Sequence, residues 1–436
     1  MCGSEAYLRY QEPALIGAEV NRRRAFASLV RTVSRGTRTL PAELPDLAVA
    51  LNAQEMWRLR ETFDEREQLF PQDPEFDQFF ADQRPDLLLV TPLVSFGGLQ
   101  ADYVKAARRL GVPSACLVFS WDNLSNKGIM HERPDRTYVW NEVQRREAVE
   151  FHQVPADSVV VTGAPRFDPF FGRTVSTTRE AFCESLGLDP TRRLVAYLGS
   201  SPLVAEREPE LVVTWIDALR GSSSGALREA QIAIRRHPRS RSIWSEHPVF
   251  RKKHPAAAGY PGVAMTPAKS AMGDQALYDL LSHADAVVGL NTTAELEAGI
   301  LGTPVYTIRA TEFASGQTGS HHFQYLLKEH GGFVECAADL NEHMVQLAAG
   351  LSGRFDRGAI RTFIRDFVRP HGLEQPAAPI LADDIEAWAN TVAGSGQASG
   401  GLPSEPSQLE GAADAPTVPP GVQEPCLLYT SPSPRD

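Results

Sequence analysis

The sequence is poor in cysteine and lacks the long apolar runs that would place it in a membrane. Its 436 residues include five cysteines, and no two of them form a Cys-x-x-Cys pair. This scarcity excludes a disulfide framework, offers no zinc-ligand spacing and is typical of a reducing cytosol. No run of about 18 apolar residues occurs, so we predict no transmembrane segment. The first residues also lack a signal-peptide pattern, and we therefore expect a cytoplasmic protein.

An excess of positive charge is also absent. The chain has 54 acidic and 43 basic residues, a net charge of −11, which argues against a nucleic-acid-binding surface. The Gly-x-Gly-x-x-Gly fingerprint of dinucleotide sites is missing, and no Asp-x-Asp motif stands in a suitable loop. We therefore expect no nicotinamide, no other cofactor and no metal ion. Hydrophobic residues make up 42% of the chain, which excludes wholesale disorder.

The last 42 residues, 395–436, differ in composition from the rest. They contain 8 Pro, 5 Gly and 6 Ser and show no apolar periodicity. Such a segment buries too little surface to offset the entropy lost on ordering, so we predict a disordered tail. Its final letters, CLLYTSPSPRD, resemble a translated sequencing adapter. We therefore expect an artefactual end and leave this tail out of the fold.

Short β-branched runs alternate with helical patterns over most of the chain, which is typical of parallel βαβ units. The runs are too continuously apolar for a one-sided sheet, so helices are expected on both faces. The predicted strands form an early and a late series, at 86–90, 115–119, 137–140 and 159–162, and then at 194–199, 231–235, 262–266, 286–290 and 304–308. The two series predict an α/β fold with two facing Rossmann-like domains.

The strand series divide the chain into five predicted parts. They are an N-terminal domain at 1–170, a connection at 171–192, a C-terminal domain at 193–375, a helix packing back at 376–394, and the tail at 395–436. Residues 1–80 show no apolar β run of the kind that normally opens such a domain. Either a helical extension precedes the domain, or the sequence begins inside it and the first strand is missing. Of these two alternatives we expect truncation.

The most informative segment is 284–304, ADAVVGLNTTAELEAGILGTP, in which a buried strand is followed by a polar turn and a helix. Thr292 is the predicted N-cap because Glu295 follows at capping-box spacing, and Glu295 itself is expected to be a solvated capping residue. The free N–H groups of the first helical turn and the two threonine hydroxyls form a predicted diphosphate site. Glu297 lies one turn further along, within reach of a ribose.

This order of strand, polar turn, Glu and Gly-x-Pro resembles the donor-nucleotide motif of GT-B glycosyltransferases and of the related non-hydrolysing UDP-N-acetylglucosamine 2-epimerases. In those families the glutamate five residues before the closing glycine holds the ribose. The resemblance gives that role to Glu297, which lies five residues before Gly302. It also gives diphosphate contacts to Asn291, Thr292 and Thr293. Many relatives have Ser or Gly in that turn, so the two threonines depart from the family pattern.

Other strand ends of the late series carry further candidate ligands. One strand runs into Gly199, Ser200 and Ser201, a turn whose backbone can approach a phosphate, although many ordinary loops begin in the same way. Another leads into Arg235 and His237, where the resembled families have a His-Pro pair beside the donor; the alternative is a basic surface loop. After the strand at 304–308, the side chains available to a donor sugar are Gln317, His321 and His322. A solvent-facing histidine pair is the alternative there.

The early series contributes a polar loop, SWDNLSNKG, after its second predicted strand. The loop offers Trp121, Asp122 and Asn123 to a substrate. An inverting transfer needs a base near the acceptor hydroxyl, and we take Asp122 as the first candidate and His131 as the second. An Asx turn that caps the loop is the alternative for Asp122. With VWNEVQRREAVEFHQVP and VVVTGAPRFDPFF, the loop resembles uncharacterised bacterial GT-B-like proteins of the surface-polysaccharide type, over about residues 80–375.

The resemblance implies a metal-independent glycosyltransferase. It would bind a nucleotide-sugar donor in the C-terminal domain and pass the sugar to a glycan or lipid-linked acceptor at the N-terminal domain. A lipid-linked acceptor would allow peripheral contact with a membrane, without a transmembrane segment. The alternatives are a sugar-nucleotide 2-epimerase, a CDP-glycerol-type polyol-phosphate transferase and a non-catalytic nucleotide-sugar-binding protein.

Overall fold

A computed structural model describes residues 73–396, with short gaps at 96–97, 203, 252–254, 256–258, 268–273, 312–315 and 318, and scattered residues between 25 and 69. The predicted tail lies outside the described residues except for its first two positions, which end the last helix. Most of the segment in which an opening strand was sought lies outside them as well.

The early strand series forms a parallel sheet, as predicted, and its four strands lie in the order β1-β2-β3-β4. Its strands are β1 (Leu88–Val90), β2 (Ser114–Leu117), β3 (Arg136–Val139) and β4 (Val159–Val161). The helices associated with it are α5 (Pro74–Gln83), α6 (Gln100–Arg109), α7 (Asn123–Asn126) and α8 (Glu142–His152). Helix α6 ends just before Gly111, whose φ of 72° is the left-handed conformation that favours glycine after a helix. We call this part the N-terminal domain.

The late series forms a six-stranded parallel sheet in the order β10-β9-β8-β5-β6-β7. Its strands are β5 (Leu194–Leu198), β6 (Gln231–Arg235), β7 (Val263–Met265), β8 (Ala286–Gly289), β9 (Val305–Ile308) and β10 (Glu335–Ala337). The sequence analysis missed β10, a three-residue edge strand. We call this part the C-terminal domain, and α9 (Asp168–Gly172) and α10 (Arg179–Ser185) lie in the connection between the domains.

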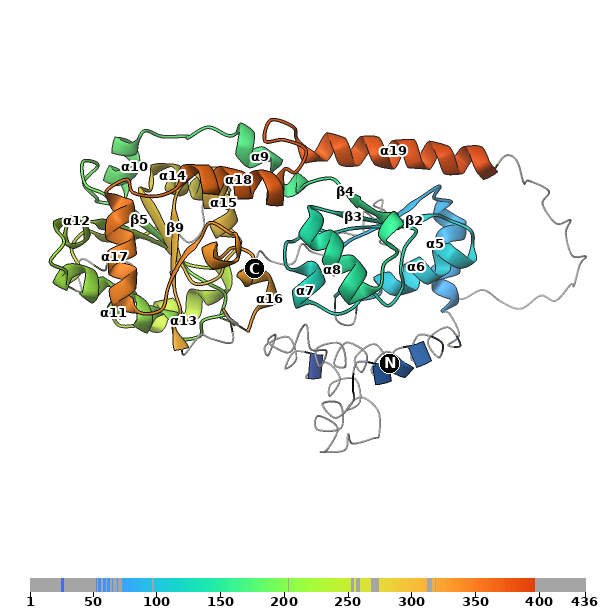
Figure 1. Cartoon of the computed structure of the whole chain (residues 1–436), viewed down its shortest axis with the longest axis horizontal. Coiled ribbons are helices and arrows are strands. Elements are labelled where there is room, and N and C mark those ends of the chain that lie inside the picture. Colours follow the sequence, from blue (N-terminus) through green and yellow to red (C-terminus); the bar gives the residue numbers. More distant parts are fainter. Residues whose placement is uncertain are drawn as a thin grey trace, which may run out of the picture.

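Helices cover both faces of the six-stranded sheet, as the apolar strands predicted (Figure 1). The helices are α11 (Glu208–Gly221), α12 (Gly225–Arg228), α13 (Arg241–Glu246), α14 (Asp274–His283), α15 (Ala294–Ile300), α16 (His321–Gln324), α17 (Leu340–Leu351) and α18 (Arg357–Val368). One apolar core packs Trp215 of α11 and Leu347 of α17 against the strands. The other contains Leu280, Leu296 and Ile364, from α14, α15 and α18. Alternating strand residues feed the two cores, so both faces are dry.

The chain reverses direction across the six-stranded sheet between β5 and β8. From β5 it continues to β6 and β7 on one side, and then returns to place β8, β9 and β10 on the other. In open α/β sheets, such a topological switch point leaves a crevice at the carboxyl ends of the two strands, where ligands bind. The four-stranded sheet has no such reversal among its described strands. The fold therefore directs the search for a ligand site to the ends of β5 and β8.

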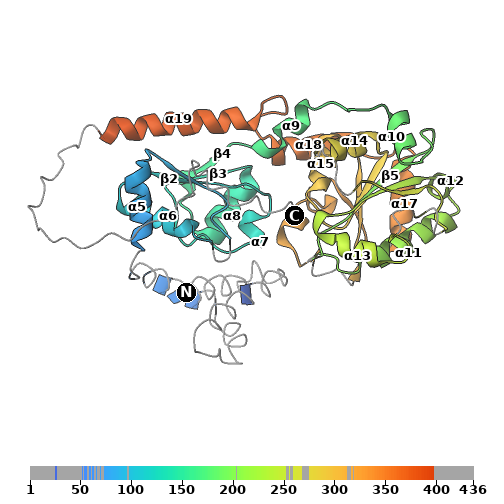
Figure 2. The same ribbon diagram turned by 180° about the vertical axis from the view of Figure 1, so that it is seen from behind.

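The last helix, α19 (Ala377–Gly396), returns to the N-terminal domain and lies along its sheet, which both views show (Figures 1 and 2). Its Trp388 packs with Ala115 and Tyr138, one residue from each of two strands. The start of the helix is fixed by the carboxylate of Asp168, which accepts hydrogen bonds from the Ala377 and Ala378 N–H groups and from the Arg369 guanidinium. Among the helices that the structure describes, none has both the length and the apolar character that a bilayer span requires.

Candidate functional site

The turn after β5 approaches the end of β6 more closely than a side chain would allow. A Cβ at Gly199 would lie 3.1 Å from the His237 nitrogen and 3.2 Å from the Arg235 carbonyl oxygen. The Gly199 N–H donates to that same carbonyl at 2.8 Å, and the Ser240 hydroxyl donates to the Ser200 carbonyl at 2.6 Å. The absence of a side chain thus allows the small turn predicted here to pack against the basic loop after β6.

A buried glutamate lies directly beneath this turn. Glu208, the first residue of α11, accepts the Ser200 N–H at 2.8 and 3.0 Å through its two carboxyl oxygens, and the Tyr197 hydroxyl donates to it at 3.1 Å. Its side chain is fully buried, and burial raises the pKa of Glu208 to about 8 although the neighbouring donors act in the opposite direction. Sequence analysis missed this residue, because a Glu at the start of a helix is usually a solvated first-turn acid.

Two arginines bring positive charge to the same end of the sheet. The Nε of Arg236 is buried and has no hydrogen-bond partner within the described part of the chain. Burial and, after it, the charge of Arg241 lower the pKa of Arg236. Two neighbouring guanidinium groups at a strand end are suited to a bound anion. Of the residues predicted from the sequence, His237 serves the loop itself, because its Nδ1 accepts the Arg239 N–H at 3.1 Å.

The turn after β8 differs from the predicted capping box. Helix α15 begins at Ala294, and its N-cap is Thr293, not Thr292. The Thr293 side chain makes no capping bond; its hydroxyl accepts the indole N–H of Trp121 from the other domain. Thr292 contributes its backbone instead, since its carbonyl accepts the Glu295 N–H at 3.0 Å. The predicted cap at Thr292 is therefore wrong. Asn291 stabilises the loop opposite, since its amide donates to the Gly316 carbonyl at 2.7 Å.

Glu295 is not the solvated residue that the sequence predicted. Its side chain is fully buried and points towards Gly289, where a Cβ would lie 2.7 Å from the carboxyl Oε1. The missing side chain at Gly289 leaves the space that this carboxyl fills. Burial raises the pKa of Glu295 to about 8, with only the Thr292 backbone lowering it, and neither oxygen accepts a hydrogen bond of regular geometry. Glu297 is 5% exposed and lies on the same short helix.

The three side chains after β9 that were predicted to contact the donor sugar have different surroundings. The Gln317 amide donates to the carbonyls of Leu290 and Ile308 and accepts the Ala310 N–H, so it holds strand ends together. This internal role leaves little of Gln317 for the donor sugar predicted as its partner. The two neighbouring histidines point to different partners. The His321 ring packs on Phe151 of α8 and on Tyr325, which follows α16, whereas His322 is buried against Trp121. Both histidines thus contact the N-terminal domain.

Trp121 connects the two domains at this point. Its indole N–H donates to the Thr293 hydroxyl at 3.3 Å, and its ring packs edge-on against His322 at 4.6 Å between centroids. Helix α7, which follows Trp121, and helix α16, which contains His322, pack against each other where the two domains meet (Figure 1). The structure thus brings together three residues that the sequence predicted separately, from two domains.

Asp122 is buried next to this contact. Burial alone would raise its pKa, but the Lys127 ammonium at 3.3 Å and the His322 ring outweigh burial and hold the pKa of Asp122 well below its usual range. A carboxylate with so low a pKa is a weak base at neutral pH, and it is suited to stabilising a neighbouring cation. His131, the second predicted base, is half-buried before β3 and is not among the main groups that shift this pKa.

Asn123 shapes the loop rather than facing a ligand. Its side-chain oxygen accepts the backbone N–H groups of Phe119 and Ser120, at 3.1 and 2.9 Å. The loop is also held from α8, where the Gln144 amide donates to the Ser120 carbonyl and the ring of His152 contacts the Leu124 carbonyl. Asn123 thus holds the backbone at the start of the loop through bonds that run back along the chain.

The chain was compared with protein families and with known proteins. No family model matches the chain. Among solved structures, the chain is similar to UDP-GlcNAc 2-epimerase from Methanocaldococcus jannaschii, with a TM-score of 0.47 and 13% identity over 78% of this chain and 84% of that one. It is also similar to a glycosyltransferase from Rickettsia africae, with a TM-score of 0.43 and 10% identity over 84% of this chain and 88% of that one.

The chain is also similar in sequence to a curated protein. The chain is 26% identical over 310 residues to lipid-A-disaccharide synthase from Syntrophotalea carbinolica, which covers 69% of this chain and 66% of that protein. The chain thus spans just under two thirds of the length of this relative.

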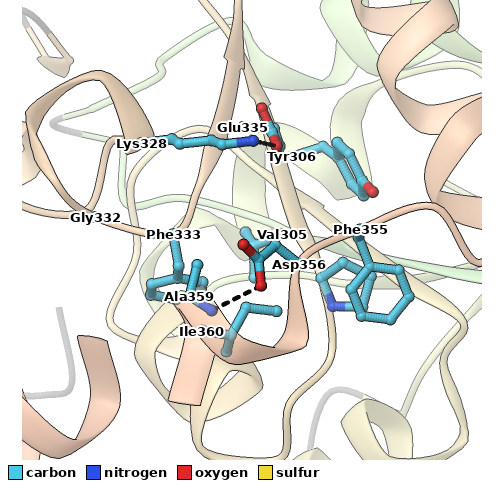
Figure 3. A pocket seen from close by; sticks show the side chains of 11 residues that line it. Val305, Tyr306, Lys328, Gly332, Phe333, Glu335, Phe355, Asp356, Ala359 and Ile360 are labelled. Atoms are coloured by element: carbon cyan, nitrogen blue, oxygen red, sulfur yellow. Dashed lines mark hydrogen bonds and ion pairs between the residues drawn. The ribbon is translucent and has the colours of Figure 1, made fainter. Parts of the chain in front are cut away.

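One hollow in the structure lies away from the carboxyl strand ends described above. It is lined by the beginnings of β9 and β10 and by the start of α18, where Asp356 caps the helix through the Ala359 N–H (Figure 3). Lys328 and Glu335 form an ion pair across it. Ligands of doubly wound sheets bind at the carboxyl ends of strands, whereas Val305 and Glu335 begin theirs. We therefore keep the switch point as the candidate site.

Proposed function

We propose that this protein transfers a sugar from a nucleotide-sugar donor to a glycan or lipid-linked acceptor. The observation that carries the proposal is the close packing of the small turn at Gly199 against the basic loop after β6, beside the switch point of the C-terminal sheet. A leaving nucleoside diphosphate needs cations and N–H or O–H donors that are already in place. The residues that we propose around the donor are Gly199, Ser200, Ser201, Arg235, Arg236, Arg241, Asn291, Thr292, Thr293 and Glu297.

The acceptor is proposed to bind at the N-terminal side of the junction. Asp122 and His322 face each other there from different domains, and both are buried with the domains in contact. We propose that the His322 ring takes the proton from the attacking hydroxyl of the sugar acceptor and that the Asp122 carboxylate stabilises the resulting imidazolium. Because both groups are buried, the acceptor has to enter before the domains close. The relative, named as a lipid-A-disaccharide synthase, supports an acceptor linked to a lipid.

Donor binding is tested by calorimetry with UDP, GDP, CDP and ADP. We expect one of the four to bind, and Arg236→Gln to weaken that binding by roughly 10- to 100-fold through loss of a charged hydrogen bond. Arg239→Gln is the matched control, because Arg239 lies on the same loop but is exposed. Equal affinities for the two variants would remove the arginine site from the proposal.

Catalysis is tested with a panel of nucleotide-sugars, by following released diphosphate with and without added acceptor. Transfer predicts acceptor-dependent release, whereas 2-epimerisation predicts an altered sugar without it. Asp122→Asn should reduce turnover while the affinity for the nucleoside diphosphate changes little, since Asp122 lies outside the donor turns. Release that no acceptor stimulates would contradict the transfer reaction.

A further inference from the structure

An exposed aromatic ring and a guanidinium lie together at the carboxyl edge of the N-terminal sheet. Phe119, two residues after β2, is 44% exposed, although Val118 before it and Trp121 after it are buried. The guanidinium carbon of Arg166, a half-buried residue, lies 5.1 Å from the centre of the Phe119 ring. An aromatic side chain left in solvent beside a cation at a strand end is a candidate binding surface.

The ends of three neighbouring strands bring the two residues together. Arg166 lies in the short helical turn η3 (Pro165–Phe167) after β4, whereas Phe119 follows β2, and β3 lies between these strands. The end of β3 fills the gap with the buried Trp140, whose ring packs against Phe167 at 5.5 Å between centroids. The Arg166 guanidinium also lies 5.1 Å from the Phe167 ring. Rings from two strand ends therefore fix the guanidinium in place.

This edge of the sheet faces the C-terminal domain. Two residues after Phe119, the Trp121 indole N–H donates to the Thr293 hydroxyl across the junction. Phe167, Trp121 and Ala294 of α15 belong to one apolar cluster, and α9, which begins directly after Phe167, packs against α15. The ring and the guanidinium thus lie on the side of the junction where the acceptor is proposed to bind.

The acidic residues of the two segments have cations of their own. The Asp122 carboxylate lies 3.3 Å from the Lys127 ammonium, and the Asp168 carboxylate accepts a hydrogen bond from the Arg369 guanidinium at 2.8 Å. An anionic group bound beside the Phe119 ring would therefore meet carboxylates that are already balanced.

The pair of Phe119 and Arg166 is suited to a sugar that carries a carboxylate. A pyranose presents an apolar C–H face, which packs on an exposed aromatic ring. A guanidinium stacked on rings uses its face for them, whereas its hydrogen bonds form at its edge. A carboxylate matches that edge with two parallel bonds and one negative charge. A phosphate monoester carries nearly two charges, so a single guanidinium favours the carboxylate.

We propose that Phe119 and Arg166 form an acceptor subsite for an acidic sugar. The pyranose ring packs against Phe119, and the sugar carboxylate binds the Arg166 guanidinium. This inference rests on the proposed function, because it names the class of acceptor that the proposed transferase would use.

The test is calorimetry of the full chain, saturated with whichever of UDP, GDP, CDP and ADP binds it. The probes are the α and β methyl glycosides of glucuronic and galacturonic acid, each paired with the methyl glucoside or galactoside that lacks the carboxylate. Glucose 1-phosphate and galactose 1-phosphate form a third group. We expect at least one acidic glycoside to bind roughly 10- to 100-fold more tightly than its neutral counterpart and more tightly than the sugar phosphates, through its charged hydrogen bonds.

Variants assign the preference to its residues. Arg166→Gln should bind the acidic and the neutral glycoside with nearly equal affinity, whereas Phe119→Leu should weaken both alike, since the ring packs on the sugar in each. Arg173→Gln is the matched control, because Arg173 is also half-buried and lies over the rings of Phe170 and Tyr278, but in the connection between the domains. It should keep the wild-type preference.

A folding defect in Arg166→Gln would not prevent the test. The wild type alone decides whether an acidic sugar is preferred. Arg166→Lys, which keeps the charge but lacks the planar edge and the stacking face, should then retain only part of the preference.

The possible failures are distinguishable. Equal affinities for acidic and neutral glycosides in the wild type, or binding of none of them, overturn this inference and leave the proposed function in place. Tighter binding of the sugar phosphates overturns the choice of a carboxylate. A preference that persists in Arg166→Gln overturns the subsite. Failure of all four nucleotides to bind overturns the proposed function, and this inference with it.

Discussion

The two sheets treat the polar residues at their strand ends in different ways. In the N-terminal domain, the loop after β2 is held by its own neighbours, since Asn123, Gln144 and His152 all bond to its backbone. In the C-terminal domain, the strand ends gather two arginines and two buried carboxyls that the described protein does not pair with each other. The first set of bonds fixes a loop, whereas the second region combines opposite charges near the strands that flank a topological switch point.

The two sheets also differ in how they are covered. The six-stranded sheet is covered on both faces by helices that its own connections supply. The four-stranded sheet depends on α19, which arrives from the end of the chain and packs Trp388 over β2 and β3. A single substitution at the start of α19 can therefore release the helix from the four-stranded sheet. We expect the largest effect from such a substitution.

Removing the anchor of α19 should destabilise the N-terminal domain most. Asp168→Ala leaves the Arg369 guanidinium, 6% exposed, without its carboxylate and removes the acceptor for two N–H groups at the start of α19. We expect a loss of about 3–5 kcal/mol in the free energy of unfolding, measured with urea. Asp366→Ala is the control, because its pair with Arg365 is exposed and should contribute no more than about 1 kcal/mol. Equal losses would show that α19 is not anchored at Asp168.

The buried carboxyls of the C-terminal domain should make stability depend on pH. Burial raises the pKa of Glu295 to about 8 from a model-compound value of 4.5. The folded state therefore keeps a proton that the unfolded chain releases, so this contribution is full below the unfolded pKa and is lost as pH rises from there to about 8. In the wild type, the free energy of unfolding measured with urea should therefore fall between pH 5 and pH 8. Glu295→Gln should reduce the slope of this fall by up to about 1.4 kcal/mol per pH unit.

The control for this effect is Glu184→Gln, which changes an exposed glutamate of α10. It should keep the wild-type dependence on pH. The same slope in wild type and Glu295→Gln would mean that Glu295 is ionised in the folded protein.

The comparison of the two sheets also shows what sequence patterns could predict. Both strand series and their division into two domains followed from continuous apolar runs, which buried parallel strands require. The missed strand, β10, is three residues long and pairs along one edge. A run so short contains no periodicity, so only its pairing with β9 identifies it.

The site was less predictable than the fold, because burial and pairing depend on residues far apart in the sequence. Glu295 has the sequence spacing of a solvated capping residue, and only the space above Gly289 shows why it is buried. Gln317 looked available for a sugar, but its amide bonds to two strand ends. The contact of Trp121 with Thr293 joins positions 172 apart, and no local pattern predicts it.

Crowding at the turn after β5 gives the next prediction. Gly199→Ala places a methyl group 3.1–3.3 Å from three backbone atoms of the loop after β6, which cannot easily move. We expect a loss of about 1–3 kcal/mol in the free energy of unfolding and weaker binding of the nucleoside diphosphate. Gly221→Ala, at the end of α11, meets no atom within 4 Å and should be neutral or slightly stabilising. An unchanged affinity in Gly199→Ala would separate this turn from the ligand site.

The smallest effect should come from one of the contacts that join the two domains, the bond between Trp121 and Thr293. Trp121→Phe keeps a ring beside His322 but removes the N–H that bonds to Thr293, at an expected cost of about 0.5–1.5 kcal/mol. Trp140→Phe is the matched control, because its indole N–H bonds to the Val118 carbonyl within one domain. The bond of Trp121 is lost whenever the domains separate, whereas that of Trp140 is not. X-ray scattering in solution should therefore show a larger radius of gyration for Trp121→Phe alone, and equal radii would mean that this bond does not hold the domains together.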